Sequence, residues 1–488
     1  MKKNSIEKNM GMNLLLTVSN FIFPLITYSY VARVLGPVGT GNVAFASSFL
    51  TYFYWIAQLG IPTYGLRECS RVRNNTKLLS QTVEEILIIN GIATLTSYIA
   101  LFAALIFVPT LHQNSRLIAI MSVSILLNSL GTEWLYQALE EYKYITIRSI
   151  MFKCIYVVLV FLLVRERKDY VVYGVLTIFA SSASYVCNFF NLRKKIEIQP
   201  VSFKQCKKHV EPIFTLFMAS IIINIYSNFD IVMIGFLQGD EKVGIYNAAL
   251  KIRNIVLSIS TSITAVIIPR MALYAQDRNK EKIINLGLQS LTASFLLAIP
   301  LVAYIMIEAK DVLLFIAGSQ YVEAQSTLII LLICVVLLVL TNLLGNQIMI
   351  PQGKDGCFTK IIFIAMIINL LLNLLLIPKY GSTGAAIGTL MAETSNVVAM
   401  IICEKEEFDS IWSRFEKGKF SVALLSAILG GLLCRKAVVN FALFWRLVST
   451  TVASFGIYYS ILLALKETIL KTQIDKILFR MQKRRSEE

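Results

Sequence analysis

The stretch AQSTLIILLICVVLLVLTNLLGNQIMI, residues 324–350, contains no charged residue, and it decides the fold class. At a rise of 1.5 Å per residue, about 20 such residues cross the hydrocarbon core of a bilayer as a helix. A helix is required because no water reaches that core to hydrogen-bond an open backbone. The stretch therefore predicts a membrane-spanning helix.

Similar apolar runs occupy most of the chain. Of its 488 residues 56% are apolar and only 16% are charged, and the mean hydropathy is +0.67. About a quarter of a soluble protein is charged, so lipid is the expected solvent for this composition. We expect an all-α polytopic membrane protein of fourteen spanning helices. They are predicted near 12–35, 41–61, 83–108, 116–137, 144–164, 170–192, 213–237, 244–268, 284–307, 324–350, 358–377, 382–402, 419–434 and 441–464.

The basic residues are distributed unevenly over the predicted loops. The loops and termini on one side carry 32 of the 46 Lys and Arg residues, whereas the loops on the other side carry 11. Cytoplasmic loops are rich in Lys and Arg, so both termini are predicted to be cytoplasmic. The net charge of +16 lies in short loops without a long basic arm, which favours contact with anionic lipid and argues against nucleic acid.

Two short motifs recur at nearly one spacing. TGNVAFA at residues 40–46 resembles VGIYNAA at 243–249, and RNNTK at 73–77 resembles RNKEK at 278–282. An offset that spans six helices predicts two parallel lobes with substrate between them. We expect an N-lobe at 1–192 (helices 1–6), an amphipathic cytoplasmic linker at 193–212 and a C-lobe at 213–402 (helices 7–12). Helices 13 and 14 and a basic cytoplasmic tail fill 403–488.

Signatures of catalysis are missing from the sequence. There is no G-x-x-x-x-G-K-[ST], G-x-S-x-G or H-E-x-x-H motif, and the chain has only two histidines. Its eight cysteines are scattered without C-x-x-C spacing and are interpreted as small buried apolar residues. We therefore predict a transporter without a metal or other cofactor rather than an enzyme.

Charged residues inside the predicted spans are the candidates for substrate contact, since each costs roughly 2.5–3.5 kcal/mol at the bilayer centre unless it is compensated. Lys153 is predicted roughly 13 Å deep, and it has no carboxylate at its depth on the same helix, which favours a cavity. Asp230 and Lys251 either neutralise each other, or Lys251 or Arg253 faces an anion-binding cavity. Glu393 is either a coupling-ion or proton site or a hydrogen-bonded structural residue.

Two asparagines, Asn369 and Asn373, are spaced to share one helix face. Such residues usually form interhelical hydrogen bonds, although a shared face also makes them cavity candidates. Basic residues between two lobes would suit an anionic substrate, with phosphate as the obvious group.

Five stretches together resemble the polysaccharide repeat-unit flippases (Wzx-type) of the MOP exporter superfamily. They are RVLGPVGTGNVAFA (33–46), YGLREC (64–69), QALEEYKYITIRS (137–149), NFDIVMIGFLQGDEKVGIYNAALKI (228–252) and NLLLNLLLIPKYGSTGAAIGTLMAE (369–393). The order and spacing of these stretches carry the resemblance, which extends over about residues 1–405.

The resemblance implies alternating inward-facing and outward-facing states in a bacterial cytoplasmic membrane. The implied cargo is an undecaprenyl-diphosphate-linked oligosaccharide, moved to the outer leaflet for capsule, O-antigen or related polymers. A polysaccharide polymerase and glycosyltransferases of the same pathway are the implied partners. The family's cationic cavity maps onto Lys251 and Arg253, and less directly onto Lys153, whereas Arg33 matches an Arg-x-Leu-Gly element at the mouth of the first helix.

Three alternative functions remain open. A multidrug antiporter of the MATE type shares the two-lobe plan, but it would need carboxylates for its cations. A lipid II flippase of the MurJ type shares the plan too, but helix 1 lacks the arginine cluster of those relatives. A membrane polymerase or glycosyltransferase would carry a sizeable outer loop or catalytic domain, which the sequence lacks.

Overall fold

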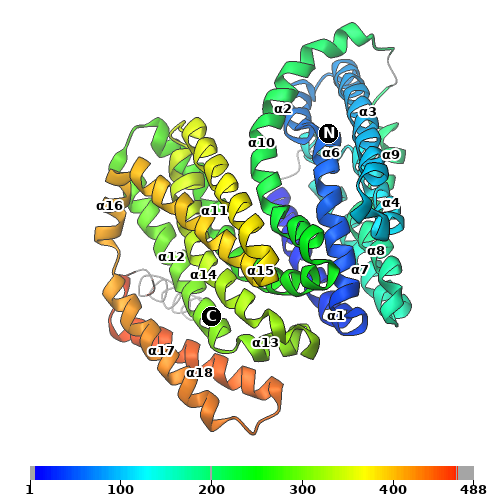
Figure 1. The fold of residues 1–488 in the computed structure, drawn as a ribbon. Helices are drawn as coiled ribbons and strands as arrows, with labels where there is room; N and C mark the ends of the chain where they lie inside the picture. Colours follow the sequence, from blue (N-terminus) through cyan, green and yellow to red (C-terminus); the bar gives the residue numbers. More distant parts are fainter. Residues whose placement is uncertain (1–5, 198–199, 469, 471–488) are drawn as a thin grey trace, which may run out of the picture. The chain divides into compact units, whose positions relative to one another are not determined.

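The computed structural model describes residues 6–197, 200–468 and 470, and these residues form helices joined by short turns (Figure 1). This confirms the predicted all-α class. The basic N-terminal flank (residues 1–5) and most of the predicted basic tail lie outside the described residues. The chain divides into two compact units between Asn247 and Ala248.

The first unit is built on α1, which α3, α7 and α10 contact along its length. Residues from Phe203 onward, in the second half of the predicted linker, already belong to α10. The elements of the first unit are α1 (Ile6–Gln58), α2 (Ile61–Val72), α3 (Thr76–Phe107), η1 (Pro109–Asn114), α4 (Ser115–Met121), α5 (Val123–Gly131), α6 (Glu133–Ala138), α7 (Tyr142–Leu163), η2 (Arg167–Asp169), α8 (Tyr170–Ile178), η3 (Phe179–Ala183), α9 (Ser184–Leu192) and α10 (Phe203–Gln238).

The second unit begins inside α11. In it α14 packs along α15, while α17 and α18 form an antiparallel pair against α12 (Figure 1). Its elements are α11 (Asp240–Gln276), α12 (Lys280–Ile307), α13 (Ala309–Ile316), η4 (Ser319–Ala324), α14 (Gln325–Thr341), η5 (Asn342–Met349), α15 (Asp355–Cys403), α16 (Lys405–Arg414), α17 (Lys417–Ala437) and α18 (Leu443–Ala464).

Two helices are interrupted by a single glycine. Gly36 in α1 has φ 68° and ψ −179°, and Gly381 in α15 has φ 55° and ψ −131°. These backbone conformations are accessible mainly to glycine, so each long helix changes direction there. The two breaks fall between predicted spans 1 and 2 and between predicted spans 11 and 12.

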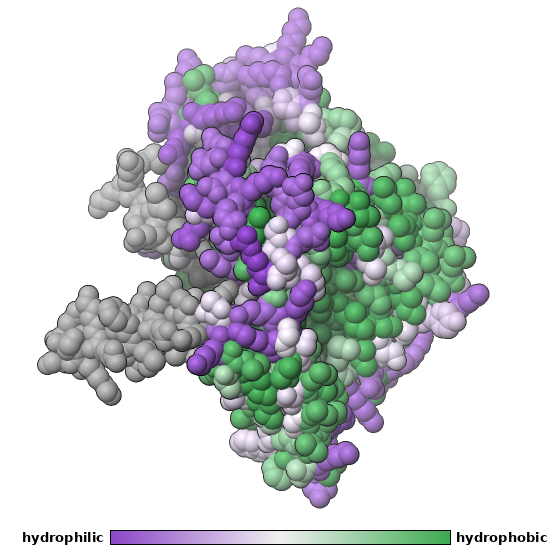
Figure 2. All heavy atoms as spheres, turned by 90° about the vertical axis from the view of Figure 1, so that its left-hand side faces the viewer, coloured by the Kyte–Doolittle hydropathy of each residue, from purple (hydrophilic) through white to green (hydrophobic). Residues whose placement is uncertain are grey.

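Many of the helices suit a bilayer. Nine helices of the described residues are long and apolar enough to cross a membrane, or ten if one bent pair counts as a single span. On the face drawn in Figure 2, hydrophobic residues cover a broad part of the surface, and hydrophilic residues gather mainly at the top and centre of the view. The count of fourteen spans stays a prediction.

The repeated motifs meet in the first unit. A Cβ atom at Gly41 would lie 1.7 Å from the Asp240 carbonyl oxygen, and one at Gly244 would lie 2.0 Å from the Pro37 carbonyl oxygen. Pro37 and Asp240 are separated by the same 203 residues as Gly41 and Gly244. The contact is therefore reciprocal, as a twofold relation between repeats requires.

The second pair of motifs also occupies equivalent positions. Asn75 caps α3 by accepting a hydrogen bond from the Leu78 backbone nitrogen at 3.1 Å. Asn279 caps α12 by accepting one from the Lys282 backbone nitrogen at 3.1 Å. An asparagine that satisfies a free N–H of the first turn is a favoured helix start, so the two motifs fix the same structural feature.

Candidate functional site in the first unit

A row of polar contacts joins α7 to α1 in the first unit. The Thr146 hydroxyl donates to the Met12 carbonyl oxygen at 3.0 Å, and the Tyr30 hydroxyl donates to the Val164 carbonyl oxygen at 2.8 Å. Both pairs are separated by 134 residues, so the two helices run parallel with a constant register. The contacts give these hydroxyl groups hydrogen-bond partners that lipid could not supply.

Lys153 lies in the middle of this row and is buried. Its ammonium group donates to the Ser19 hydroxyl at 3.0 Å and also to the Asn20 side-chain oxygen. Within the described part of the chain, no carboxylate lies within ion-pair distance of Lys153. Neutral oxygens therefore hold the side chain in place without cancelling its charge.

Arg148 lies five residues before Lys153 on α7, and sequence reasoning did not single it out. Its side chain is only 5% exposed. The guanidinium carbon lies 5.5 Å from the ring centroids of Tyr144 and Tyr185, and one terminal nitrogen is 3.8 Å from a Glu133 carboxylate oxygen. Rings and carboxylate thus surround the cation on several sides.

The guanidinium of Arg148 is incompletely paired. Its Nε and one terminal nitrogen are shielded from water and find no acceptor among the described residues. A buried donor left without a partner costs about 1–3 kcal/mol. An acceptor oxygen from a bound molecule would remove this cost, and phosphate oxygens match the planar donor geometry of arginine.

The backbone places Glu133 beside this arginine. Thr132 has φ 41° and ψ 36° and separates α5 from α6, so Glu133 is the first residue of a new helix. Gly131 packs against the Tyr185 ring, where a Cβ atom would lie 2.6 Å from the ring carbon Cγ. The break in the helix therefore brings a carboxylate and an aromatic ring to Arg148 from two neighbouring elements.

The predicted acid Asp230 accepts a hydrogen bond from the Tyr246 hydroxyl at 2.6 Å. Lys251 and Arg253 are half-buried on α11, and the Arg253 guanidinium donates to the Asn254 side-chain oxygen at 3.0 and 3.2 Å. These contacts leave both alternatives for Asp230 and Lys251 open, so the roles of the three residues stay predictions.

The predicted polar residues of α15 are all buried, the two asparagines before the break at Gly381 and Glu393 after it. Asn373 donates to the Asn369 side-chain oxygen at 3.1 Å, and a Cβ atom at Gly388 would lie 2.4 Å from the Asn373 side-chain oxygen. Glu393 is buried and accepts from the Asn396 side-chain nitrogen at 3.3 Å. The asparagine pair thus lies between the two halves of α15.

The predicted mouth residue Arg33 lies on the surface of the first unit. Arg33 is exposed three residues before the break in α1, and it donates to the Ser29 carbonyl oxygen at 2.7 Å.

The interpretation of the cysteines as buried holds for Cys69, Cys206 and Cys334, but it is wrong for Cys154 and Cys403, which are exposed. Exposure of the Cys154 thiol on the apolar helix α7 is tolerated because lipid, like a protein core, accepts an apolar surface.

The geometry therefore defines a multi-pass helical membrane protein with buried cations in its first unit. The chain belongs to the polysaccharide biosynthesis protein family, whose model matches residues 6–275, and a MatE model matches residues 216–375. The family that the sequence resembles is thereby confirmed.

Curated relatives agree with this family. A putative O-antigen transporter of Escherichia coli K12 is 24% identical over 405 residues, which are 82% of this chain and 96% of that protein. A probable low-salt glycan biosynthesis flippase of Haloferax volcanii is 27% identical over 173 residues, or 36% of each chain.

Solved structures show the same fold. The lipid II flippase MurJ in an inward closed conformation has a TM-score of 0.72 at 15% identity, covering 93% of this chain and 98% of that one. An inward-facing multidrug resistance MATE family transporter of the MOP superfamily has a TM-score of 0.64 at 15% identity, covering 80% and 94%. This chain therefore has the fold of MOP-superfamily transporters.

Proposed function

We propose that this protein is a flippase for a lipid-linked oligosaccharide. The observation that carries the proposal is the pair of buried cations on α7, Lys153 without a carboxylate partner and Arg148 with two unpaired nitrogens. Placing such charge inside an apolar span is costly, so it is expected where an anionic group must be held. The names of the O-antigen transporter and glycan flippase relatives support the same cargo class.

The proposed cargo is an undecaprenyl-diphosphate-linked repeat unit, which moves from the cytoplasmic to the outer leaflet of the cytoplasmic membrane. Its diphosphate would be held by Lys153 and Arg148 in the first unit, and Lys251 and Arg253 on α11 stay candidates for the same role. The polar head group needs a hydrated path while the lipid tail remains in the bilayer. Two lobes that open alternately, at 1–192 and 213–402, would supply this path without a catalytic step.

The remaining predicted residues receive roles that follow from their positions. Arg33 contacts cargo at the outer mouth, and Asn369 and Asn373 provide neutral hydrogen bonds to sugar hydroxyls or stabilise α15. Asp230 and Glu393 are the candidates for ion coupling. Both termini are cytoplasmic in this proposal, and the polymerase and glycosyltransferases of the same pathway act on either side of the transport step.

Flipping by the purified protein in liposomes tests the proposal directly. The substrate is a fluorescent undecaprenyl-diphosphate oligosaccharide, and the readout is the fraction accessible to a membrane-impermeant quencher. Lys153→Met, Arg148→Gln, Lys251→Ala and Arg253→Ala are each expected to slow flipping at least tenfold while the protein stays in the membrane. The matched control is Lys310→Gln, which removes an exposed lysine of α13.

Two outcomes would overturn the assignment. Flipping at the wild-type rate by both α7 variants would remove the proposed cationic site from the first unit. Absence of flipping by wild-type protein, together with increased drug resistance of cells that express it, would favour a second candidate function. That candidate is a cation or drug antiporter, which the match of residues 216–375 to the MatE model favours.

A further inference from the structure

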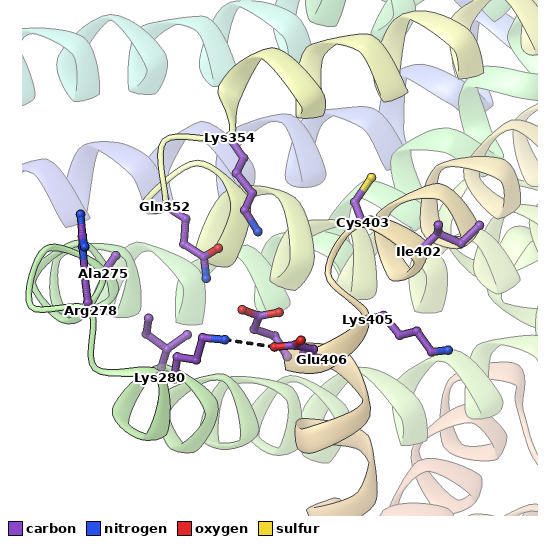
Figure 3. A pocket seen from close by; sticks show the side chains of 11 residues that line it. Ala275, Arg278, Lys280, Gln352, Lys354, Ile402, Cys403, Lys405 and Glu406 are labelled. Atoms are coloured by element: carbon purple, nitrogen blue, oxygen red, sulfur yellow. Dashed lines mark hydrogen bonds and ion pairs between the residues drawn. The ribbon is translucent and has the colours of Figure 1, made fainter.

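A cavity of about 550 Å³ lies in the second unit, apart from the proposed cargo residues. Three turns form it: the turn from α11 to α12, the turn from η5 to α15, and the turn from α15 to α16 (Figure 3). On the topology that the charge count predicts, these turns are cytoplasmic. The cavity therefore lies at the level of the lipid head groups.

Basic and acidic side chains both line this cavity. Lys280 and Lys354 extend toward the same space from opposite sides in Figure 3, and Lys280 pairs with Glu406 at 3.0 Å. Lys354 pairs at 2.7 Å with Glu404, which is fully buried. In these two ion pairs the opposite charges neutralise each other, and the pairs hold the turns together.

Other charged groups of the lining remain available for a ligand. Arg278 and Lys405 are exposed, and among the described residues neither has a carboxylate within ion-pair distance. The Glu407 carboxylate likewise has no basic partner within ion-pair distance in the described ranges. The cavity thus offers donors to a phosphate and acceptors to an ammonium group.

An apolar stripe of α15 leads to the cavity. Met391, Val398 and Ile402 are 53%, 51% and 71% exposed, and Ile402 is part of the cavity lining. Their spacing places them on one helix face. From Met391 to Ile402 the helix rises about 16 Å, close to the thickness of one hydrocarbon leaflet.

We propose that the cavity binds a phospholipid whose head group carries both a phosphate and a primary ammonium, with an acyl chain along the α15 stripe. Arg278 would donate to the phosphate, and Glu407 would accept from the ammonium. A purely anionic head group would meet the Glu407 carboxylate without compensation. A choline head group has no N–H to donate to it.

Thermal unfolding of the full-length protein in detergent tests this site. The added lipids are phosphatidylethanolamine, phosphatidylcholine and phosphatidylglycerol of the same acyl chains, each titrated to saturation. A ligand that binds the folded state raises the unfolding midpoint in proportion to its occupancy. Only phosphatidylethanolamine is expected to give a saturable increase, and glycerophosphoethanolamine, which lacks the acyl chains, is expected to give almost none.

Matched variants locate the effect. Arg278→Gln and Glu407→Gln remove no ion pair of the described residues, and each is expected to weaken the phosphatidylethanolamine response at least fivefold. Lys310→Gln is expected to respond as wild type. The proposal is wrong if phosphatidylcholine or phosphatidylglycerol matches phosphatidylethanolamine, if both cavity variants keep the wild-type response, or if the soluble head group binds as well as the lipid.

Discussion

At the scale of single residues, Gly41 and Gly244 allow two backbone segments to touch. No Cβ fits at either position, because a carbonyl oxygen of the facing segment lies closer than 2.5 Å to where it would be. We expect Gly41→Ala and Gly244→Ala each to cost about 3 kcal/mol or more, since backbone must move. Denaturant unfolding in detergent measures the loss.

The control for this prediction is Gly91→Ala. Gly91 lies on an exposed face of α3, and a Cβ there would meet nothing within 4 Å. Its substitution is expected to change stability by less than about 1 kcal/mol, in the direction of the higher helix propensity of alanine. Equal effects at Gly41 and Gly91 would contradict the close backbone contact.

Glu85 is the centre of a buried hydrogen-bond cluster in the first unit. Its fully buried carboxylate accepts hydrogen bonds from Gln81 at 2.9 Å, from Lys208 at 2.8 Å and from His209 at 2.6 Å. The Tyr64 hydroxyl forms a hydrogen bond with the other ring nitrogen of His209. These residues fasten the start of α10 to α2 and α3.

Removing this carboxylate should separate the three helices. We expect Glu85→Ala to cost about 3–5 kcal/mol, because donors that are now satisfied lose their acceptor. Glu85→Gln keeps one acceptor oxygen, so its cost should be nearer 1–3 kcal/mol. Protease accessibility of the 193–212 segment should rise in the same order. Similar stability of the two variants would argue against an ionic role for Glu85.

Sequence reasoning located part of the candidate site and missed the rest. Lys153 was predicted because it lies deep in an apolar run, and the structure shows it buried. Arg148 lies only six residues after the start of α7, near the edge of the predicted span 144–164, and the charge count therefore assigned it to the preceding loop as a topology residue. Its burial depends on Tyr144, Tyr185 and Glu133, and no local pattern joins all of them.

At the scale of elements, hydropathy predicts where apolar helices lie but not how they are interrupted. Gly36 and Gly381 fall between predicted spans, yet each is a one-residue break inside a longer helix. Apart from its first residue, the short helix α2 lies outside the predicted spans, because its 12 residues are too few to cross a bilayer. Its buried Ile61 and Tyr64 pack against neighbouring helices and are not lipid-facing.

A charged cluster fastens α17 and α18 to the rest of the second unit. Arg446 pairs with Asp311 at 2.7 Å, and Arg435 lies 3.6 Å from Glu308 while donating to the Ile307 carbonyl oxygen at 2.8 Å. Glu308 is completely buried, and neither of its carboxylate oxygens accepts a hydrogen bond from the described residues. Burial therefore raises the pKa of Glu308 above its ordinary value.

The raised pKa of Glu308 gives the stability a pH dependence of known sign. The folded state binds this proton more tightly than the unfolded state, so the contribution is complete below the ordinary carboxyl range, near pH 4.3. It is lost as the pH rises through the folded pKa. Glu308→Gln mimics the protonated form, so its advantage over wild type should grow from pH 4 to 8. Parallel unfolding midpoints across that range would contradict this.

At the scale of the whole molecule, the repeat explains why the fold was predictable and the site was not. Motifs 203 residues apart, one after the first predicted span and one after the seventh, indicated two related halves, and Gly41 and Gly244 meet reciprocally. Hydropathy and repeat spacing are local or periodic signals that one sequence contains. Which charged groups face a cavity depends on helix rotation and breaks, which composition does not encode.

The proposed cargo also makes transport electrogenic. A diphosphate with two negative charges that moves outward gains about 4.6 kcal/mol at an inside-negative potential of 100 mV, if its charge crosses the whole field. We expect flipping in proteoliposomes to accelerate when a potassium gradient with valinomycin sets this potential, and to slow when the sign is reversed. A neutral-headed lipid serves as the control cargo. A rate that ignores potential but follows a proton or sodium gradient would show that a coupling ion compensates the charge, and Asp230 and Glu393 would then be the residues to substitute.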